Sequence, residues 1–568
     1  MSIGTKEELE RLLNSIDGSS YPAYKQCRGK WDFGFFVLSI DHVQGDPFAA
    51  PSSLRVLLTE KAAGLPRDYY DEPHRRLACE EIILRGFSRA LQEDSIRGRA
   101  GSGKSGLLST DRPGQEILKR SALQISDDGQ VQACLDAGFP ANGRRIHAKP
   151  LIQMLFSRLT ETVKHTLLYK NLDTKKLEQA VFLSDDQAAI RSALEPMGLV
   201  AFLGDGAILP RESGISSRPM KGAVPFASPD SLAVTIETPH AGKLRGMGIK
   251  KGVTLIIGGG YHGKSTLLQA LETGIYDHIA GDGREYVIAE GDAVKSRAED
   301  GRSVYKVDIS LFIRNLPDKT DTTCFSTQNA SGSTSQAAGI SETIESGAHL
   351  LLLDEDTCAT NLMVRDEVME SVVAWTEEPI CPFVHRVRGL SDDLGISTIL
   401  VAGSSGAFFA QADIVIRMDH YRAMDVTEKA HATAESFGLK REKGEALSFP
   451  DFSRKPMPDH WLKKPGERIK LRTNGTDSFS INHNEVDLRG MEQVLCTEMT
   501  AGLMLSVKKI LTEIMNGRRS MQECVELFLD SLKKTGMHAL FDGTPHGGVV
   551  LPRKQEILAA LSRYRYPV

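Results

Sequence analysis

The stretch GVTLIIGGGYHGKSTLLQALETGI, from Gly252 to Ile275, decides the fold of this chain. Its apolar run Val253–Ile257 predicts a strand buried on both faces, and the residues that follow match the pattern GxxxxGK[ST] over Gly258–Ser265. In such a loop the backbone N–H groups surround phosphate oxygens, and the helix behind the loop adds the positive end of its dipole. The order of strand, glycine loop and amphipathic helix therefore predicts a nucleotide-binding site.

The residues of this loop have expected roles. Lys264 should contact the β- and γ-phosphates of ATP or ADP, and the hydroxyl of Ser265 should bind Mg²⁺. The other positions should contribute backbone to the phosphate cradle, together with Lys264 and Ser265 themselves. These positions are Gly258, Gly260, Tyr261, His262, Gly263 and Thr266.

Two carboxylates follow another strongly apolar run. Leu350–Leu353 lead directly into Asp354 and Glu355. A magnesium–nucleotide enzyme needs carboxylates on a strand next to its phosphate loop. We expect Asp354 to hold Mg²⁺ through water, and Glu355 to polarise the water that attacks the γ-phosphate. The two motifs together predict ATP hydrolysis, with Lys264 and Glu355 as the catalytic residues.

A loop of small residues, NASGSTSQAAGISETIE, spans Asn329–Glu345 and opens a predicted helix. One interpretation is an ordinary serine-capped helix. Between the phosphate loop and Asp354, however, the segment is typical of the signature loop of an ABC-type ATPase. Ser331, Gly332 and Ser333 would then contact the γ-phosphate bound by a second subunit, because a helix start presents free amides and a positive dipole.

This arrangement has a consequence for the oligomeric state. Each complete site takes a phosphate loop from one subunit and a signature loop from another, and the chain has one convincing copy of each. We therefore expect a homodimer with two ATP molecules at its interface. Asp356–Asn361 (DTCATN) stands where such ATPases carry the loop that contacts the other subunit.

A second match to the phosphate-loop pattern, GRAGSGKS at Gly98–Ser105, lacks the strand and helix that this chemistry requires. Three interpretations stay open: a second nucleotide site, a flexible surface loop, or a basic loop that grasps a nucleic-acid backbone. Residues 95–120 carry six basic and two acidic side chains, a local charge of 6 − 2 = +4. Basic side chains among glycines favour contact with RNA phosphates. The candidate RNA-binding residues are Arg97, Arg99 and Lys104.

The composition is that of an ordinary globular protein. Of 568 residues, 41% are apolar and 25% are charged, which excludes wholesale disorder. The net charge is 69 − 74 = −5, so nucleic acid must bind a local patch. No apolar run approaches the roughly 18 residues that cross a bilayer, and no membrane partner is expected. Eight scattered cysteines without a CxxC pair indicate thiols in a reducing compartment.

Changes in pattern divide the chain into three zones. Residues 1–198 mix short strand-like pieces, such as Trp31–Ile40, with helices and basic glycine-rich loops, and predict an α+β N-terminal domain. Residues 199–435 alternate short buried strands with helices, which predicts an ABC-type P-loop ATPase core, a parallel sheet flanked by helices. Residues 436–568 should hold a linker and a mostly helical C-terminal domain. The expected fold class is α/β.

Together these motifs resemble a specific family, the predicted ATPases of the ABC class found in bacteria and in kinetoplastid protozoa. Within it, the chain is most similar to the kinetoplastid mitochondrial RNA-binding-complex members associated with RNA editing. Further matching stretches are DHVQGDPFAAPS (Asp41–Ser52), GSGKSG (Gly101–Gly106), GFPANGR (Gly138–Arg144), FLGDGAILPRESG (Phe202–Gly214), GDGRE (Gly281–Glu285), RAEDGR (Arg297–Arg302) and VDLRGMEQ (Val486–Gln493).

The resemblance implies an ABC-fold homodimer that hydrolyses ATP and couples the cycle to binding or remodelling of RNA in an RNA-processing complex. It places the RNA-contacting loop at Arg97–Lys104, where the charge count pointed, and implies sequence-tolerant binding of single strands. It also implies a mitochondrial location; without it a cytoplasmic location is expected, because the first residues show no transit peptide. The alternative is an ATP-gated clamp on RNA or protein with little turnover.

Three features depart from the usual pattern of ABC ATPases. Gly403–Ser405 stands where a switch histidine would sense the γ-phosphate, which favours the clamp. No aromatic residue lies between Ser231 and Gly260 to stack on adenine. The Q-loop glutamine has no clear counterpart, and Arg297–Arg302 and Asp308 are the two candidates for its role.

Overall fold

The computed structural model describes residues 3–97, 101–365, 372, 378–403, 405–441, 444–458, 462 and 469–566. They fall into two compact units, one formed by Met1–Asp185 with Phe541–Leu551 and the other by Asp186–Leu540 with Pro552–Val568. The first division lies inside helix α6 (Thr174–Leu194), before the boundary predicted at residues 198 and 199. The N-terminal unit thus includes a short segment from near the end of the chain.

A mostly antiparallel sheet forms the centre of the N-terminal unit. Its strand order is β1-β2-β3-β4-β8-β5, and β7 also pairs with β8. Alternate side chains of β4 are fully buried, as in a strand with one face on the core. The strands are β1 (Gly4–Thr5), β2 (Gly29–Asp32), β3 (Val37–His42), β4 (Ser52–Leu58), β5 (Leu108–Ser109), β7 (Leu123–Ile125) and β8 (Val131–Ala137).

The strand-like stretch predicted over Trp31–Ile40 is a hairpin. β2 and β3 pair antiparallel, with Asp32 opposite Val37. The chain reverses between them through Gly34, whose φ of 91° is unfavourable for a residue with a side chain. The helices of this unit are α1 (Lys6–Ser15), α2 (Glu60–Ala63), α3 (Pro73–Arg97), α4 (Ala148–Ile152) and α5 (Thr160–Thr166), with a π-helical turn at Gln153–Leu159.

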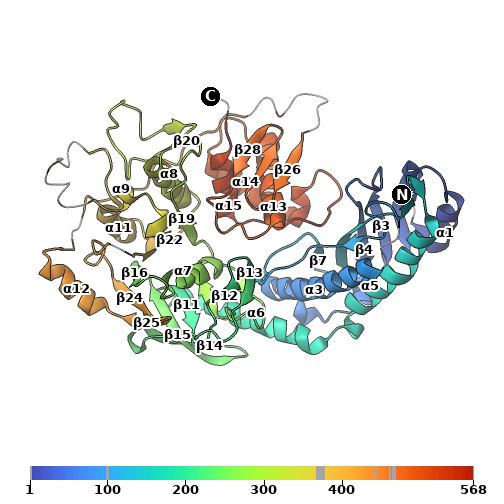
Figure 1. Cartoon of the computed structure of the whole chain (residues 1–568), viewed down its shortest axis with the longest axis horizontal. Coiled ribbons are helices and arrows are strands. Elements are labelled where there is room, and N and C mark those ends of the chain that lie inside the picture. The colour runs from blue at the N-terminus through green and yellow to red at the C-terminus, as the bar shows by residue number, and fades with distance from the viewer. Residues whose placement is uncertain are drawn as a thin grey trace. The chain divides into compact units, whose positions relative to one another are not determined.

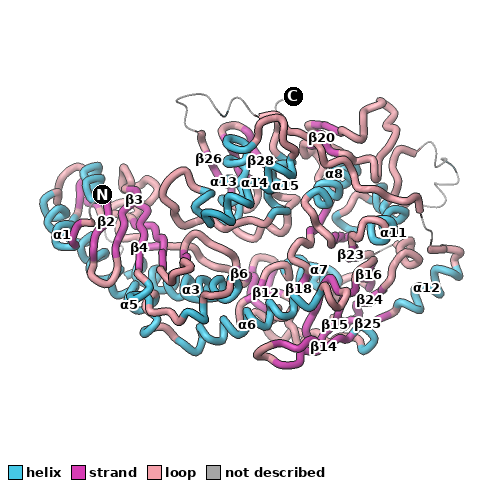
Figure 2. Tube along the Cα trace, turned by 180° about the vertical axis from the view of Figure 1, so that it is seen from behind, coloured by secondary structure: helices cyan, strands magenta, loops and turns pink. Residues whose placement is uncertain are grey.

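The second unit is built around a six-stranded sheet with the order β19-β22-β23-β16-β24-β25. Its strands β23, β16, β24 and β25 can be followed in Figure 2. All pairs are parallel except the hairpin of β24 and β25. Parallel strands end at one edge, so the loop after β16 and the acid that ends β22 share that edge. The strands are β16 (Val253–Gly258), β19 (Val294–Ser296), β22 (Leu350–Asp354), β23 (Ser397–Val401), β24 (Ile414–Asp419) and β25 (Arg422–Asp425).

Both faces of this sheet are covered, which confirms the predicted ABC-type α/β core. Alternate leucines of β22 belong to two apolar cores, one shared with helices α8 (Gly332–Glu345) and α11 (Phe383–Asp392), the other with α7 (Lys264–Thr273). Neighbouring side chains of a strand point to opposite faces, so a strand covered on both sides must be apolar throughout. Four consecutive leucines meet that requirement.

A second, antiparallel sheet contributes to the core on the α7 side. Its order is β14-β15-β11-β18. Its strands are β11 (Leu199–Gly204), β14 (Ala233–Thr238), β15 (Gly242–Lys250) and β18 (Val287–Ala289). Two further antiparallel pairs join β12 (Arg211–Ser213) to β13 (Ser216–Pro219), and β20 (Val304–Val307) to β21 (Phe325–Thr327).

The C-terminal part of this unit contains a sheet that the helical prediction did not include. β26 (Leu471–Asn474), β27 (Ser478–Ile481) and β28 (Asn484–Asp487) pair antiparallel. The missed signal is Asn474-Gly475, a typical hairpin turn, in which Gly475 has a φ of 57°. The expected helices follow (Figure 1): α13 (Thr497–Lys509), α14 (Met521–Thr535) and α15 (Lys554–Arg563).

The structure also bears on membrane-spanning helices and on the state of the cysteines. Among the described residues, no helix combines the length and apolar character that crossing a bilayer needs. The eight cysteines all lie in the described ranges, and they form no disulfide bond.

Candidate functional site

The phosphate loop joins β16 to α7 and passes very close to β24. A Cβ added to Gly258 would lie 2.3 Å from the carbonyl oxygen of Met418, so a side chain has no room there. Gly258 and Gly263 have φ values of 144° and 98°, which glycine adopts without strain. These two glycines are therefore required by the backbone path of the loop.

Lys264 reaches back across the loop that precedes it. Its Nζ donates hydrogen bonds to the carbonyl oxygens of Gly258 (2.8 Å) and Gly259 (2.9 Å). The N-cap of α7 is Gly263, which offers no side chain to its first amides. Ser265 is exposed in the first turn. A lysine ammonium, uncapped amides and an accessible hydroxyl thus meet at one helix start, which suits a phosphate group.

Asp354 ends β22 on the same edge of the sheet. It is 8% exposed, and burial raises the pKa of its carboxyl above the usual value. Its carboxylate accepts a hydrogen bond from the N–H of Asp356 at 3.3 Å. Asp354 and Ser265 offer hard oxygen donors, the kind that Mg²⁺ prefers together with water and phosphate oxygens. The residues present therefore fit this ion.

Glu355 is held by the main chain of a neighbouring strand. Its Oε2 accepts a hydrogen bond from the N–H of Gly403 at 2.7 Å. Gly403 follows β23, which lies between β22 and β16 in the sheet. A backbone amide thus contacts Glu355 from the loop where the switch histidine was expected. Ser404, the next residue of this loop, lies outside the described residues.

The two candidates for the Q-loop role differ in position. Arg297–Arg302 directly follows β19, the neighbour of β22, and therefore begins at the edge that carries Asp354. Asp308 instead accepts hydrogen bonds from the N–H groups of Ser310 and Asp451, at 2.9 and 3.0 Å. Its carboxylate is engaged in holding local backbone. The geometry favours Arg297–Arg302.

Ser331 caps helix α8, as the simpler interpretation expected. Its side chain accepts a hydrogen bond from the N–H of Thr334. Ser331 is exposed, whereas Ser333 is 7% exposed and its hydroxyl donates to Asn361 Oδ1 at 2.7 Å. The signature segment is thereby joined to the DTCATN segment. Contact of Ser331, Gly332 and Ser333 with a phosphate across a dimer stays a prediction.

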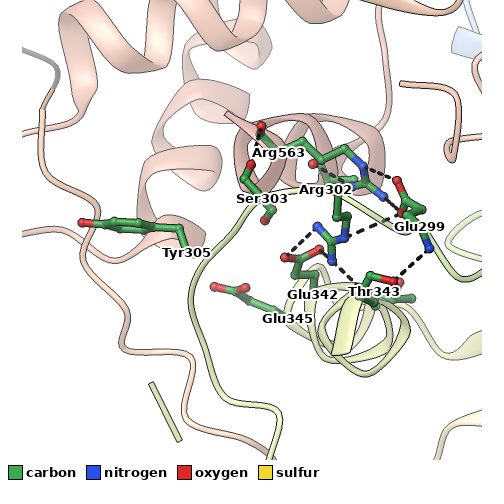
Figure 3. Close-up of polar contacts among 12 residues, drawn as sticks. Glu299, Arg302, Ser303, Tyr305, Glu342, Thr343, Glu345 and Arg563 are labelled. Atoms are coloured by element: carbon green, nitrogen blue, oxygen red, sulfur yellow. Dashed lines mark hydrogen bonds and ion pairs between the residues drawn. The ribbon is translucent and has the colours of Figure 1, made fainter. Parts of the chain in front are cut away.

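A network of buried charges lies behind the signature helix (Figure 3). Arg302 forms a two-pronged contact with Glu342 of α8, with distances of 2.9 and 3.3 Å. Arg563 of α15 pairs with Glu299, its Nε lying 3.1 Å from Oε2. Burial alone would raise the pKa of Glu299, but Arg563 and Arg302 keep it below its ordinary value. The network ties the C-terminal helix to the signature helix through Glu299–Arg302.

We expect Arg302→Leu to lower the free energy of unfolding by about 3–5 kcal/mol, because Glu342 would keep a buried charge without its main partner. The measurement is urea denaturation of the full chain. Lys533→Ala is the matched control, since its 3.0 Å pair with Asp530 is exposed and worth at most about 1 kcal/mol. Equal losses for the two variants would contradict a structural role for the network.

Three sequence motifs of the N-terminal unit converge on one loop cluster. Three backbone N–H groups of the GSGKSG loop donate hydrogen bonds of 2.9 Å to carbonyl oxygens of the other two motifs. The N–H of Ser102 donates to Ala141, that of Lys104 to Pro47, and that of Gly106 to Gly138. A Cβ on Gly138 would lie 1.8 Å from the carbonyl oxygen of Lys104. Two amides inside the pattern, those of Ser102 and Lys104, are therefore bonded to protein, which argues against a second nucleotide site. Gly98–Ala100 of the pattern lie outside the described residues.

The predicted RNA-binding residues lie at or near this cluster. Arg97 ends α3, and its side chain lies outside the described residues, as does the whole of Arg99. Lys104 is exposed. Beside it lies Phe48, which is 65% exposed although aromatic, with its ring against Gly103. Reasoning from charge alone did not mark Phe48.

The turn between β24 and β25 is a second feature that the sequence did not mark. Among the described residues, His262 of the phosphate loop forms a close group with Asp419 and His420 of this turn. The Nδ1 of His262 accepts a hydrogen bond from the N–H of His420 at 3.1 Å, so its lone pair is already engaged. The group fastens the turn to the phosphate loop.

Comparison with known families accounts for nearly all of the chain. The P-loop domain of the ABC ATPases matches residues 173–454, and the N-terminal domain of ATPases of the ABC class matches residues 6–170. The C-terminal domain of MRB1590 matches residues 470–567. The C-terminal match extends over both the small sheet and the helices that follow it.

Individual relatives are more distant. MJ1628, an uncharacterized protein of Methanocaldococcus jannaschii, is 31% identical over 256 residues, which cover 43% of this chain and 55% of that protein. The chain thus spans about half the length of this relative. CbiO1 of Clostridium perfringens, part of the transporter complex CbiONQ, matches with a TM-score of 0.26 and 16% identity over 42% of this chain and 94% of its own. The ADP conformation of MJ1267, an ATP-binding cassette of an ABC transporter, matches with a TM-score of 0.23 and 12% identity over 35% of this chain and 89% of its own.

Proposed function

We propose that this chain, which carries the P-loop and N-terminal domains of ABC-class ATPases and an MRB1590-type C-terminal domain, hydrolyses ATP as a homodimer and couples that cycle to single-stranded RNA. The observation that carries the proposal is the shared sheet edge. Lys264 follows β16 and Asp354 ends β22. Glu355 accepts a hydrogen bond from the N–H of Gly403, which follows β23, the strand between β22 and β16.

Each residue at this edge has a separate role in the hydrolysis of ATP. Lys264 neutralises the charge that develops on the terminal phosphates, and the amides at the start of α7 bind their oxygens. Bound Mg²⁺, held through Ser265 and Asp354, would supply electrophilic stabilisation of the phosphate oxygens. Glu355 takes the proton of the attacking water. The N–H of Gly403 fixes the orientation of this carboxylate.

The proposal of a homodimer rests on the arrangement of Ser331 and the DTCATN segment. The exposed start of α8 in one subunit would meet the phosphate loop of the other. Ser333 and Asn361 join the signature segment to the DTCATN segment at 2.7 Å, so the two would move together when a partner binds. Two complete sites then form at one symmetric interface.

The N-terminal loop cluster supports RNA as the partner. Lys104 and Arg144 are exposed basic residues on adjoining loops, and Arg144 is also paired with Asp46 at 3.0 Å. Exposed Phe48 lies beside them. Basic side chains that track phosphates, together with an aromatic ring on which a base stacks, are typical of sequence-tolerant binding of single strands. The C-terminal match to MRB1590 supports a partner complex that binds RNA, and a mitochondrial location rests on the family resemblance alone.

A second candidate function is an ATP-gated clamp with little turnover. It is favoured by Gly403, whose backbone amide stands where transporter-type ABC ATPases place a histidine side chain. A backbone N–H can hold Glu355, but unlike a histidine side chain it cannot change its protonation state or adopt another rotamer. A motor should hydrolyse ATP faster when RNA is present, whereas a clamp should change only its affinity for RNA.

The test is steady-state ATP hydrolysis with and without single-stranded RNA, at low and moderate salt. We expect stimulation that fades with salt, because phosphate contacts release counterions. Replacing Arg97, Arg99 and Lys104 by Ala should remove the stimulation and flatten the salt dependence of RNA binding.

The matched control replaces three exposed lysines of the same unit, Lys170, Lys175 and Lys176, which changes the net charge equally. Hydrolysis that ignores RNA, with RNA affinity that depends on ATP, would favour the clamp. RNA binding that survives the Arg97, Arg99 and Lys104 changes with its salt dependence intact would contradict the assignment of this loop.

A further inference from the structure

The β24–β25 turn stands directly beside the phosphate loop. β24 pairs in parallel with β16, with Met418 opposite Gly258, so the turn begins where the phosphate loop begins. The N–H of Tyr421 donates to the carbonyl oxygen of His262 at 3.2 Å. The carboxylate of Asp419 lies 2.8 Å from Nδ1 of His420 and 3.1 Å from Nδ1 of His262. Backbone and side-chain contacts therefore fix the turn against the loop.

These contacts fix the backbone from which the ring of Tyr421 extends. A Cβ on Gly263 would lie 3.2 Å from Cδ1 of Tyr421, so one edge of the ring rests on the residue that precedes Lys264. Tyr421 nevertheless remains 55% exposed. Its φ of 67° and that of 47° at His420 are unusual for residues with side chains. An aromatic ring is thus presented to solvent from a tight turn.

The direction of the nucleotide follows from the sheet. In an open parallel sheet the ligand lies across the carboxyl ends of the strands. β16 has β23 on one side and β24 on the other. The β23 side carries Gly403 and Glu355, and so takes the γ-phosphate and the attacking water. The opposite end of the nucleotide, its base, then extends over the end of β24.

A base at that position needs an apolar or aromatic surface. The segment from Ser231 to Gly260, which precedes the phosphate loop, contains no Phe, Tyr or Trp. The turn after β24 supplies Tyr421 instead, from about 160 residues further along the chain. Aromatic rings hold nucleobases by offset stacking and tolerate every base, because each has a π-face.

We propose that Tyr421 is the residue on which the purine base of the bound nucleotide stacks, and that the β24–β25 turn forms the base subsite of this ATPase. The inference rests on the proposed ATP binding at Lys264. It assigns the base contact to the turn between two strands of the core sheet rather than to a segment before the phosphate loop. Tyr421 acts in binding and takes no part in the chemical step.

The test compares the dissociation constants of ATP and of inorganic tripolyphosphate, which lacks ribose and base. Tyr421→Asn removes the ring while tolerating the left-handed backbone. We expect this variant to bind ATP about 5- to 150-fold more weakly, the range for loss of one stacked base, and to bind tripolyphosphate with unchanged affinity. Tyr421→Phe, which keeps the ring, should restore ATP affinity to within about twofold of the unmodified chain.

The outcomes separate this inference from the function on which it rests. Unchanged ATP affinity in Tyr421→Asn would overturn the base subsite and leave ATP binding intact. Equal weakening of ATP and tripolyphosphate would also overturn it, because Tyr421 would then act through the phosphate loop. Failure of the unmodified chain to bind ATP would instead overturn the proposed function.

Discussion

Replacing Lys264 by Ala should weaken ATP binding by about 100-fold or more. The ammonium that now donates to the carbonyl oxygens of Gly258 and Gly259 is the charge placed to receive the terminal phosphates. Each hydrogen bond to a charged group contributes about 1.5–3 kcal/mol, and the γ- and β-phosphates would lose at least two. Equilibrium binding of a fluorescent ATP analogue measures the loss.

Lys251→Ala is the matched control for this variant. Lys251 lies just before β16, at the opposite end of the strand, and its Nζ pairs with Glu195 at the surface. Its removal should leave ATP affinity within about twofold of the unmodified chain, because a surface pair contributes little. If Lys264→Ala binds ATP as tightly as this control, the loop does not hold the phosphates.

Replacing Glu355 by Gln should leave ATP binding intact and lower kcat by about 10²- to 10⁴-fold. The amide oxygen of Gln still accepts the N–H of Gly403, so the side chain keeps its place, but it no longer takes a proton. ATP should then remain bound, and the closed homodimer should accumulate. Steady-state hydrolysis measures the first effect, and light scattering with ATP measures the second.

Glu428→Gln makes the same chemical change at an exposed position of α12 (Thr427–Ser436) and serves as the control. Full turnover by Glu355→Gln would remove Glu355 as the base. A Glu355→Gln protein that stays monomeric with ATP bound would contradict the homodimer. The two results are independent. A Glu355→Gln protein that is monomeric and inactive would support Glu355 as the base but contradict a site shared between two subunits.

Several features of the nucleotide site could be predicted from the sequence because they are local. Val253–Ile257 is apolar because both faces of β16 are covered, and the glycine loop and α7 follow without interruption. The acidic pair likewise follows four leucines, which only a strand buried on two faces requires. Each signal spans fewer than about twenty residues, the range over which strand and helix periodicity is expressed.

Other features depend on contacts between segments far apart in the chain. The N–H of Gly403 reaches Glu355, Tyr421 rests on Gly263, and the loop at Gly101–Gly106 gives its amides to two other loops. That last contact argues against a second nucleotide site, although the sequence pattern of the loop is complete.

The physical reason is that periodicity and spacing describe which faces of an element are apolar, not which elements meet. Packing of the elements determines which groups pair with buried backbone N–H groups and where a close approach leaves no room for a Cβ. It also determines that Arg302 pairs with Glu342. The sequence alone therefore determined the nucleotide site and its strand, loop and helix. Only the tertiary structure decided what holds Glu355 and which aromatic ring lies against Gly263.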